Sequence, residues 1–235
     1  MWLLLLWAAF LFGGFILGPT RNNRRIPRWA RLASSLILVI AAWGWQSLAT
    51  PTLYRTYTTL IALGMTSGFI GDLFLANIFT SKRSKAVLGG MGGFAIGHLF
   101  YIAGMLMAAS TLQLTNIYIF GATLILFWLF AFWSWRKIVI RNVARDSQRP
   151  STLQRAALPY ALLLATTAAL ALAAALQHPP FWPLALGTIL FLLSDLLLAE
   201  ALFNDSTIPL HHDLVWLLYG PGQMFIVYST MMLLK

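Results

Sequence analysis

The sequence predicts an all-α membrane protein, a polytopic bundle of about eight transmembrane helices. Of its 235 residues, 60% are hydrophobic and only 9% are charged, whereas about a quarter of the residues of a soluble domain carry charge. Three runs contain no charged residue: 3–17, 114–135 and 158–176. A helix needs about 20 apolar residues to cross a bilayer. These runs lack the polar and apolar alternation of a membrane β-barrel, so helices are expected.

Polar or Pro- and Gly-rich segments divide the chain into its expected spans. The predicted spans are 2–18, 31–49, 54–79, 87–109, 115–136, 157–177, 181–203 and 212–234, all in a single transmembrane domain, 1–235. No basic residue precedes the first apolar run, and no small-residue cleavage site is evident, so this segment is expected to be a retained helix. The absence of cysteine excludes disulfides and thiolate nucleophiles.

The net charge of +10 is distributed unevenly between the connections. The even-numbered connections carry only Arg55, and Lys235 ends the chain. The odd-numbered ones carry Arg21, Arg24, Arg25, Arg28, Arg31, Lys82, Arg83, Lys85, Arg136, Lys137, Arg141, Arg145, Arg149 and Arg155. This asymmetry predicts odd connections in the cytoplasm and both termini outside, in a cell membrane such as the bacterial inner membrane. The basic residues are read as topology signals rather than a nucleic-acid site, with phosphate binding by a few of them left open.

Two carboxylates fall inside apolar helices, where their burial is expensive. Asp72 and Asp195 lie in the third and seventh predicted spans, and a carboxylate at a helix centre costs about 2.5–3.5 kcal/mol on insertion scales. His98 and Gln223, on the fourth and eighth spans, fall at a similar depth in the cytoplasmic half. We expect the four side chains to share a functional site. Asp146, Asp205 and Asp213 are expected to be solvated or to cap helices, and Glu200 to reach the interface.

An internal repeat brings the same polar positions into correspondence. Residues 69–76 align with 192–199 and residues 97–100 with 222–225. A period of four helices predicts halves of about 1–110 and 111–235, related by an axis along the membrane normal, with the site between them. Glycines near Asp72 and His98 are expected to let helices approach closely, and Pro221 to kink the last helix beside Gln223.

Metal and nucleotide chemistry have little support in the sequence. His211, His212 and Asp213 are adjacent, so they point in different directions on a helix, and no third strong ligand is evident. We expect them to act at the interface as capping groups. The chain contains no phosphate-binding loop, dinucleotide fingerprint or nucleophile elbow.

Four motifs in order resemble the YhhN family, which includes the lysoplasmalogenases and has about eight transmembrane helices. They are Gly71-Asp72-x-x-Leu75, Gly97-His98-x-x-Tyr101, Ser194-Asp195-x-x-Leu198-Ala199 and Tyr219-x-x-x-Gln223, and Pro159-Tyr160 is also similar. One departure is Gly220-Pro221-Gly222, where the family more usually has an aromatic and small residues.

The resemblance implies an ether hydrolase of lipid metabolism. Its substrate would be a lysoplasmalogen or related ether lipid, cleaved at the vinyl ether to a fatty aldehyde and a glycerophospho-base. Two buried carboxyls suit this chemistry, one as acid and one to stabilise the cation and orient water. Asp72 and Asp195 are the expected pair, without assignment of which is which. Other residues are expected to position water or to line the cavity: His98, Gln223, Tyr101, Tyr160, Tyr219 and Ser194.

The scheme requires no cofactor and no metal, and the expected partners are the lipid substrate and the surrounding membrane lipids. Two other functions remain open from the sequence. Intramembrane Asp and His also form proton relays, and parallel repeats occur in carriers, so a small proton-coupled transporter is one alternative. A non-catalytic lipid-binding membrane protein is the other.

Overall fold

The computed structural model describes residues 2–20, 24–49, 53–140, 151–204 and 208–233. Within these ranges every regular element is helical and no strand is present. Some of the residues considered above lie outside the described residues, namely Arg21, Arg141, Arg145, Arg149, Lys235, Asp146 and Asp205. The all-α prediction is therefore confirmed for the part of the chain that is described.

The helices form eight rods, of which three are extended by short π or 3-10 turns. The first rod joins α1 (Trp2–Ala8), a π turn (Ala9–Gly13) and α2 (Gly14–Leu17). The others are α3 (Arg28–Leu48), α4 (Leu53–Leu75), α5 (Arg83–Thr111), α6 (Ile117–Trp135) with a π turn (Arg136–Ile140), α8 (Ser151–Gln177), α9 (Trp182–Phe203) after a 3-10 turn (Pro179–Phe181), and α10 (His211–Leu233).

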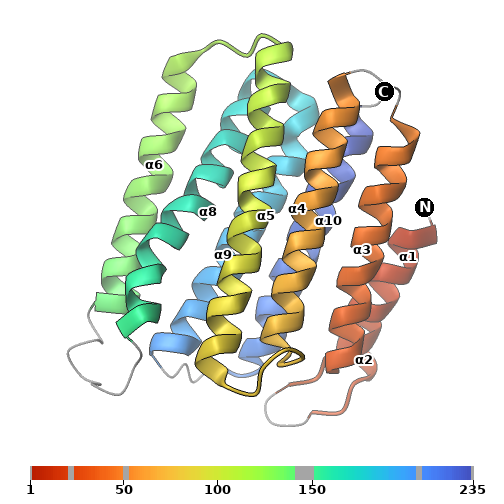
Figure 1. Cartoon of the computed structure of the whole chain (residues 1–235), viewed down its shortest axis with the longest axis vertical. Helices are drawn as coiled ribbons and strands as arrows, with labels where there is room; N and C mark the ends of the chain where they lie inside the picture. The colour runs from red at the N-terminus through yellow and green to blue at the C-terminus, as the bar shows by residue number, and fades with distance from the viewer. Residues whose placement is uncertain (1, 21–23, 50–52, 141–150, 205–207, 234–235) are drawn as a thin grey trace.

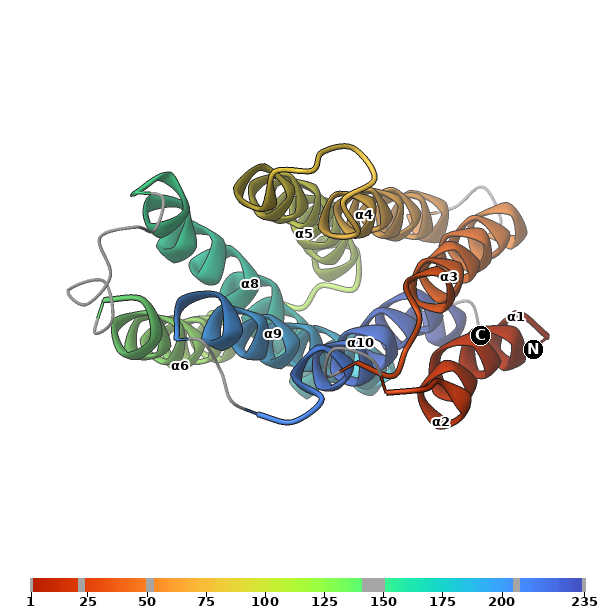
Figure 2. The ribbon, with the colours of Figure 1, turned by 90° about the horizontal axis from the view of Figure 1, so that it is seen from below.

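Six of these helices close into a ring. Each neighbouring pair is in contact in the order α3, α4, α5, α8, α9, α10 and back to α3. The ring is visible in the view along the helices, with α4 and α5 on one side and α9 and α10 on the other (Figure 2). The α1–α2 rod packs outside it on α3, and α6 packs outside it on α8. Side chains that point inward from six helices can therefore meet.

Within the described part of the chain, five helices are long and apolar enough to cross a membrane. They comprise 54–75, 83–111, 117–140, 152–177 and 179–203. The rod from Trp2 to Leu17 is apolar but shorter. Helices of this kind are typical of an integral membrane protein. Membrane crossing by the other three rods stays a prediction.

The connections that carry the basic residues lie at one end of the bundle. Basic residues lie at the start of α3 (Arg28, Arg31), at the start of α5 (Arg83, Lys85) and in the π turn that follows α6 (Arg136, Lys137). All three places are at the lower end of the bundle in Figure 1, so the described basic residues of these connections lie at one end.

Helix α4 ends four residues earlier than the predicted 79. The backbone amide of Ile78 donates to Leu73 O at 3.1 Å and that of Asn77 to Phe74 O at 2.9 Å, while Asn77 has a positive φ of 56°. This is a Schellman motif with asparagine in the left-handed position. Asp72 therefore lies three residues from the helix end at Leu75, or about 4.5 Å along the axis, closer to it than the predicted span 54–79 placed it.

Helices α4 and α5 cross at facing glycines, as the sequence predicted for small residues. A Cβ on Gly93 would lie 2.7 Å from Gly71 N, and one on Gly97 would lie 2.8 Å from Gly64 O. Ser67 Oγ also donates across the crossing to Gly93 O at 2.9 Å. Because these contacts are to backbone, no side-chain rearrangement can make room there. The crossing fixes Asp72 on α4 relative to α5.

The crossing predicts opposite effects for two adjacent glycines. The Gly93→Ala substitution should lower the free energy of unfolding by about 1–3 kcal/mol, because the added methyl group forces the two backbones apart. The Gly92→Ala substitution is the matched control, since its Cβ would meet nothing within 4 Å and alanine favours helix by up to about 1 kcal/mol. Thermal unfolding of the purified variants in detergent measures the difference. Equal midpoints for the two variants would contradict the close crossing.

Candidate active site

A polar cavity of ≈ 550 Å³ lies among α3, α4, α5, α9 and α10, and both intramembrane aspartates line it. Asp72 comes from α4 and Asp195 from α9, on opposite sides of the helix ring. The remaining charged or titratable groups of its wall are Arg24, Arg28, Arg31, Arg83, His212 and Tyr219. The cavity therefore combines two carboxylates with a set of cations.

Asp72 is held by hydroxyl groups from two other helices. Its Oδ2 accepts a hydrogen bond from Ser35 Oγ of α3 at 2.6 Å and one from the Tyr219 hydroxyl of α10 at 2.9 Å. The side chain is only 2% exposed. Two donors to one oxygen stabilise the ionised carboxylate, so this environment suits a group that keeps its negative charge.

Gln223 extends this network to α5. Its Oε1 accepts a hydrogen bond from the Tyr101 hydroxyl at 2.9 Å, and its Nε2 donates to the Tyr219 hydroxyl at 3.4 Å. The structure thus brings four predicted site residues, Asp72, Tyr219, Gln223 and Tyr101, into one chain of hydrogen bonds. Neither Gln223 nor Tyr101 lines the polar cavity. They lie outside the lining of the cavity, and the bond from Gln223 orients the Tyr219 hydroxyl that donates to Asp72.

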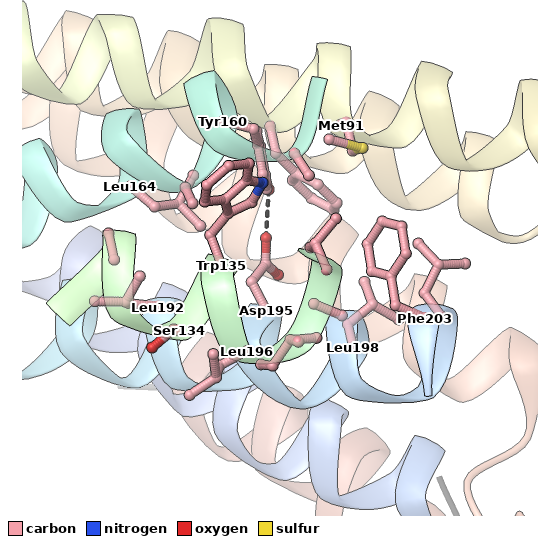
Figure 3. A pocket seen from close by; sticks show the side chains of 18 of the residues that line it. Met91, Ser134, Trp135, Tyr160, Leu164, Leu192, Asp195, Leu196, Leu198 and Phe203 are labelled. Carbon is pink, nitrogen blue, oxygen red and sulfur yellow. Dashed lines mark hydrogen bonds between the residues drawn. The ribbon is translucent and has the colours of Figure 1, made fainter. Parts of the chain in front are cut away.

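Asp195 occupies a different environment, at the boundary between the polar cavity and an apolar pocket. The apolar pocket has a volume of ≈ 100 Å³ and lies among α5, α6, α8 and α9. Figure 3 shows Asp195 in this pocket, pointing toward Tyr160 of α8, with Leu164, Leu192 and Phe203 around them. The Tyr160 hydroxyl donates a hydrogen bond to Asp195 Oδ2. Asp195 is the only acidic residue in the lining of this pocket.

His98 is placed apart from both carboxylates. It is 1% exposed, lines neither cavity, and packs edge-on against Phe191 with ring centroids 4.5 Å apart. Thr167 Oγ1 donates to Leu163 O and lies 3.0 Å from His98 Nδ1. The threonine oxygen therefore accepts from Nδ1–H, and the neutral ring keeps an acceptor at Nε2. This Nε2 is buried and has no hydrogen-bond partner among the described residues.

Ser194 lies in the wall of the polar cavity, but its hydroxyl serves its own helix. Ser194 Oγ donates to Phe191 O at 2.7 Å, and the residue is fully buried. Such a bond to the preceding turn satisfies the hydroxyl without a ligand. Ser194 therefore contributes a small side chain next to Asp195.

Helix α10 continues through Pro221 without interruption, from His211 to Leu233. The glycines on either side of Pro221 instead allow close packing. A Cβ on Gly220 would lie 2.5 Å from the Leu11 side chain, and one on Gly222 would lie 2.9 Å from Gly187 O of α9. The Gly-Pro-Gly departure from the family pattern thus falls where α10 packs against both the first rod and α9.

Asp213 was expected to be solvated or to cap a helix; it is not solvated, because the side chain is 1% exposed, and it instead binds backbone amides of another segment. Its two carboxylate oxygens accept from the backbone amides of Arg25 at 2.6 Å and Ile26 at 2.9 Å. Asp213 thereby fastens the connection before α3 to the start of α10. The neighbouring histidines have other partners, Leu197 O for His211 and Arg24 for His212. Within the described residues, no group of three His, Asp or Glu side chains could hold a metal ion.

Sequence reasoning missed Ser35 and Thr167, which bond directly to Asp72 and His98. Each lies in a pair of small hydroxyl residues, Ser34-Ser35 or Thr166-Thr167, inside an otherwise apolar helix. Such a pair is a usable signal, since a hydroxyl in a membrane helix faces a partner on its own or another helix. Which member of the pair faces inward depends on the helix rotation.

The geometry defines a class of protein: a helical membrane bundle that buries two differently solvated carboxylates beside an apolar pocket. The model of the YhhN family matches residues 27–230. The chain therefore belongs to the YhhN family, which is associated with lysoplasmalogenase-type function. Neither the curated proteins nor the solved structures include a significant match to this chain.

The network around Asp72 predicts a stability effect at Tyr219. The Tyr219→Phe substitution removes a donor to Asp72 and an acceptor for Gln223, so it should lower the free energy of unfolding by about 1–3 kcal/mol. Tyr228→Phe on the same helix is the control, because Tyr228 is half-buried and packs its ring on Trp45, and it should change stability by less than about 0.5 kcal/mol. Thermal unfolding in detergent compares them. A Tyr219→Phe variant as stable as wild type would rule out the network.

Proposed function

We propose that the protein hydrolyses the vinyl ether bond of a lysoplasmalogen or a closely related ether lipid. The observation that carries this proposal is the position of Asp195, which lines both the apolar pocket and the polar cavity that contains Asp72. An amphiphile with its chain in the apolar pocket and its glycerol in the polar cavity would present its ether linkage to Asp195. Family membership supports the same reaction.

The first step is transfer of a proton from a carboxylic acid to the β-carbon of the vinyl ether. This carbon is on the chain side of the linkage, so the acid must stand next to the apolar pocket, which favours Asp195. The C=C electron pair forms the new C–H bond, and an oxocarbenium ion results at the α-carbon. The hydrogen bond from Tyr160 to Oδ2 leaves Oδ1 of Asp195 to carry the proton.

The second step is addition of water to the α-carbon. Asp72, held by Ser35 and Tyr219, would stabilise the cation and accept a proton from the attacking water. The hemiacetal then collapses: the bond from the α-carbon to the glycerol oxygen breaks, that oxygen takes up the proton from Asp72, and the hemiacetal hydroxyl returns a proton to Asp195. The net change is one water consumed, with a fatty aldehyde and a glycerophospho-base released.

We also infer that the chain consists of two related halves and that all eight rods cross the membrane. The ring order supports this inference, since α3, α4 and α5 are followed by α8, α9 and α10, with α1 packed on α3 as α6 packs on α8. Asp72 bonds to the preceding helix through Ser35, and Asp195 does so through Tyr160. The basic end of the bundle would face the cytoplasm.

The direct test is release of fatty aldehyde from a 1-alkenyl lysophospholipid by detergent-purified protein. The Asp195→Asn and Asp72→Asn variants should each lower kcat by about 10²–10⁴-fold, because an amide neither protonates carbon nor carries negative charge. Glu200→Gln is the matched control on α9: it makes the same chemical change, but Glu200 pairs with Asn204 and lines neither cavity. It should keep wild-type turnover.

Full turnover by Asp195→Asn would overturn the assignment of the acid. No aldehyde from well-folded wild-type protein would instead favour the alternatives. Substrate flux in sealed vesicles would then indicate a proton-coupled carrier, and lipid binding with neither flux nor product would indicate a non-catalytic lipid-binding protein.

Substitution of Tyr160 should lower kcat and leave KM nearly unchanged. The Tyr160→Phe variant loses the hydroxyl that orients Asp195, so kcat should fall about 10-fold, which corresponds to the loss of one hydrogen bond of about 1.4 kcal/mol. KM should change less than about threefold, because the ring remains in the pocket wall. Tyr118→Phe, at a residue that is 85% exposed on α6, should alter neither constant. An unchanged kcat for Tyr160→Phe would remove Tyr160 from the mechanism.

A further inference from the structure

Four arginines line the polar cavity. Arg24 lies in the connection before α3, Arg28 and Arg31 in the first turn of α3, and Arg83 at the start of α5. All four line the cavity that contains Asp72 and Asp195. They lie at the lower end of the bundle in Figure 1, where α3 and α5 begin. Two connections that are far apart in sequence thus supply one cationic surface.

Three of the four guanidinium groups, those of Arg24, Arg28 and Arg31, contact neutral groups. Arg24 Nη2 lies 2.9 Å from His212 Nε2, and Arg28 Nη1 donates to Ala76 O at 3.1 Å. The Arg31 guanidinium carbon lies 5.5 Å from the centroid of the Trp216 ring, and its buried Nε has no hydrogen-bond partner among the described residues. Each guanidinium offers five N–H donors, so most of this donor capacity remains for a ligand.

Four arginines outnumber the two carboxylates, Asp72 and Asp195, in the wall of this cavity. Burial lowers the pKa of Arg24 from its ordinary value, Asp213 opposes this change, and the nearby Arg83 adds to it. Arginine nevertheless keeps its charge in proteins, so the like charges repel one another across the cavity. The starts of α3 and α5 add positive ends of helix dipoles, and neither helix has a side-chain cap at its first turn. An anion would relieve both effects.

Arg25 shows the contrast with a structural arginine in the same connection. Its Nη2 donates to Ile16 O at 2.9 Å and its Nε to Gly18 O at 3.3 Å, and its guanidinium stacks on Phe15. Arg25 therefore closes the end of α2 and does not line the cavity. The four cavity arginines lack such a set of carbonyl partners.

The cavity and the apolar pocket adjoin at Asp195 and share five other lining residues, Leu75, Val87, Phe94, Leu198 and Leu202. A single ligand that fills both must carry an anionic group at one end and an apolar chain at the other. Planar guanidinium groups match the geometry of phosphate oxygens and bind them in pairs of hydrogen bonds.

We propose that Arg24, Arg28, Arg31 and Arg83 form a phosphate-binding site that holds the phosphate of a lysophospholipid while its chain enters the apolar pocket. This inference rests on the proposed function, since it places the ether linkage between the arginines and the pocket, at the two carboxylates. The glycerophospho-base released by hydrolysis would remain at the arginines after the aldehyde separates. The site would thereby select phosphate-bearing ether lipids over ether glycerols.

The test is binding of a 1-alkyl lysophospholipid, whose saturated ether has no double bond to protonate, to the purified full-length protein in detergent. A 1-alkylglycerol with the same chain is the phosphate-free ligand. Wild-type protein should bind the phosphate-bearing ligand at least 10-fold more tightly. The Arg83→Gln and Arg31→Gln variants should each weaken that binding about 10-fold and leave alkylglycerol binding unchanged. Arg83 is exposed at the start of α5, so its variant should fold even if the Arg31 variant does not.

Lys85→Gln is the matched control, because Lys85 is an exposed cation two residues from Arg83 that does not line the cavity. It should change neither affinity. Equal wild-type affinity for the two ligands would overturn the proposal, as would an Arg83→Gln variant that loses both ligands equally. Inorganic phosphate that competes as tightly as the lysophospholipid would overturn the lipid source of the phosphate. Phosphate-selective binding without aldehyde release from the vinyl ether would leave the arginine site standing and remove the hydrolase function.

Discussion

The burial of the Asp72 carboxylate is the constraint on which the rest of the structure depends. A charged or polar group that leaves water must find partners within the protein, and Asp72 finds them on α3 and α10. These bonds join helices from both ends of the chain around one oxygen. The glycine crossing with α5 fixes the position of Asp72 relative to that helix, and the Schellman motif at Asn77 and Ile78 ends α4 soon after Asp72.

The two carboxylates differ in their surroundings although both line the same cavity. Asp72 receives two hydroxyl donors in a polar network, whereas Asp195 has one donor, Tyr160, and faces apolar side chains. A pair of titratable groups in unlike environments is the usual arrangement when one acts as acid and the other remains ionised. The four arginines add a third kind of environment in the wall of the same cavity. A polar head, an ether linkage and a chain would each meet side chains of matching chemistry.

Much of this arrangement could be predicted from the sequence, because helices that face lipid need long runs of apolar residues. The helices follow from the long apolar runs, and the meeting of Asp72 and Asp195 in one cavity follows from the cost of burying polar groups in a membrane. The rotation of each helix about its own axis is harder to predict from the sequence. Depth along a helix placed His98 with the carboxylates, but its rotation points it to Thr167 and Phe191. Asp213 was misjudged for a related reason, since its partners are backbone amides, which no side-chain pattern reveals.

The hydrogen bond between Tyr219 and Asp72 joins residues 147 positions apart. A chain is synthesised from its N-terminus, so α4 enters the membrane long before α10 exists. Until the ribosome has delivered the last helix, Asp72 lacks one of its two donors, and the connection before α3 lacks the carboxylate of Asp213. In a chain truncated before α10, the Asp72 carboxylate would lie inside the membrane with only the Ser35 hydroxyl as a donor. Such a chain would be less stable than the complete one. The completed molecule thus differs from its shorter precursors in the second hydrogen bond to its buried carboxylate.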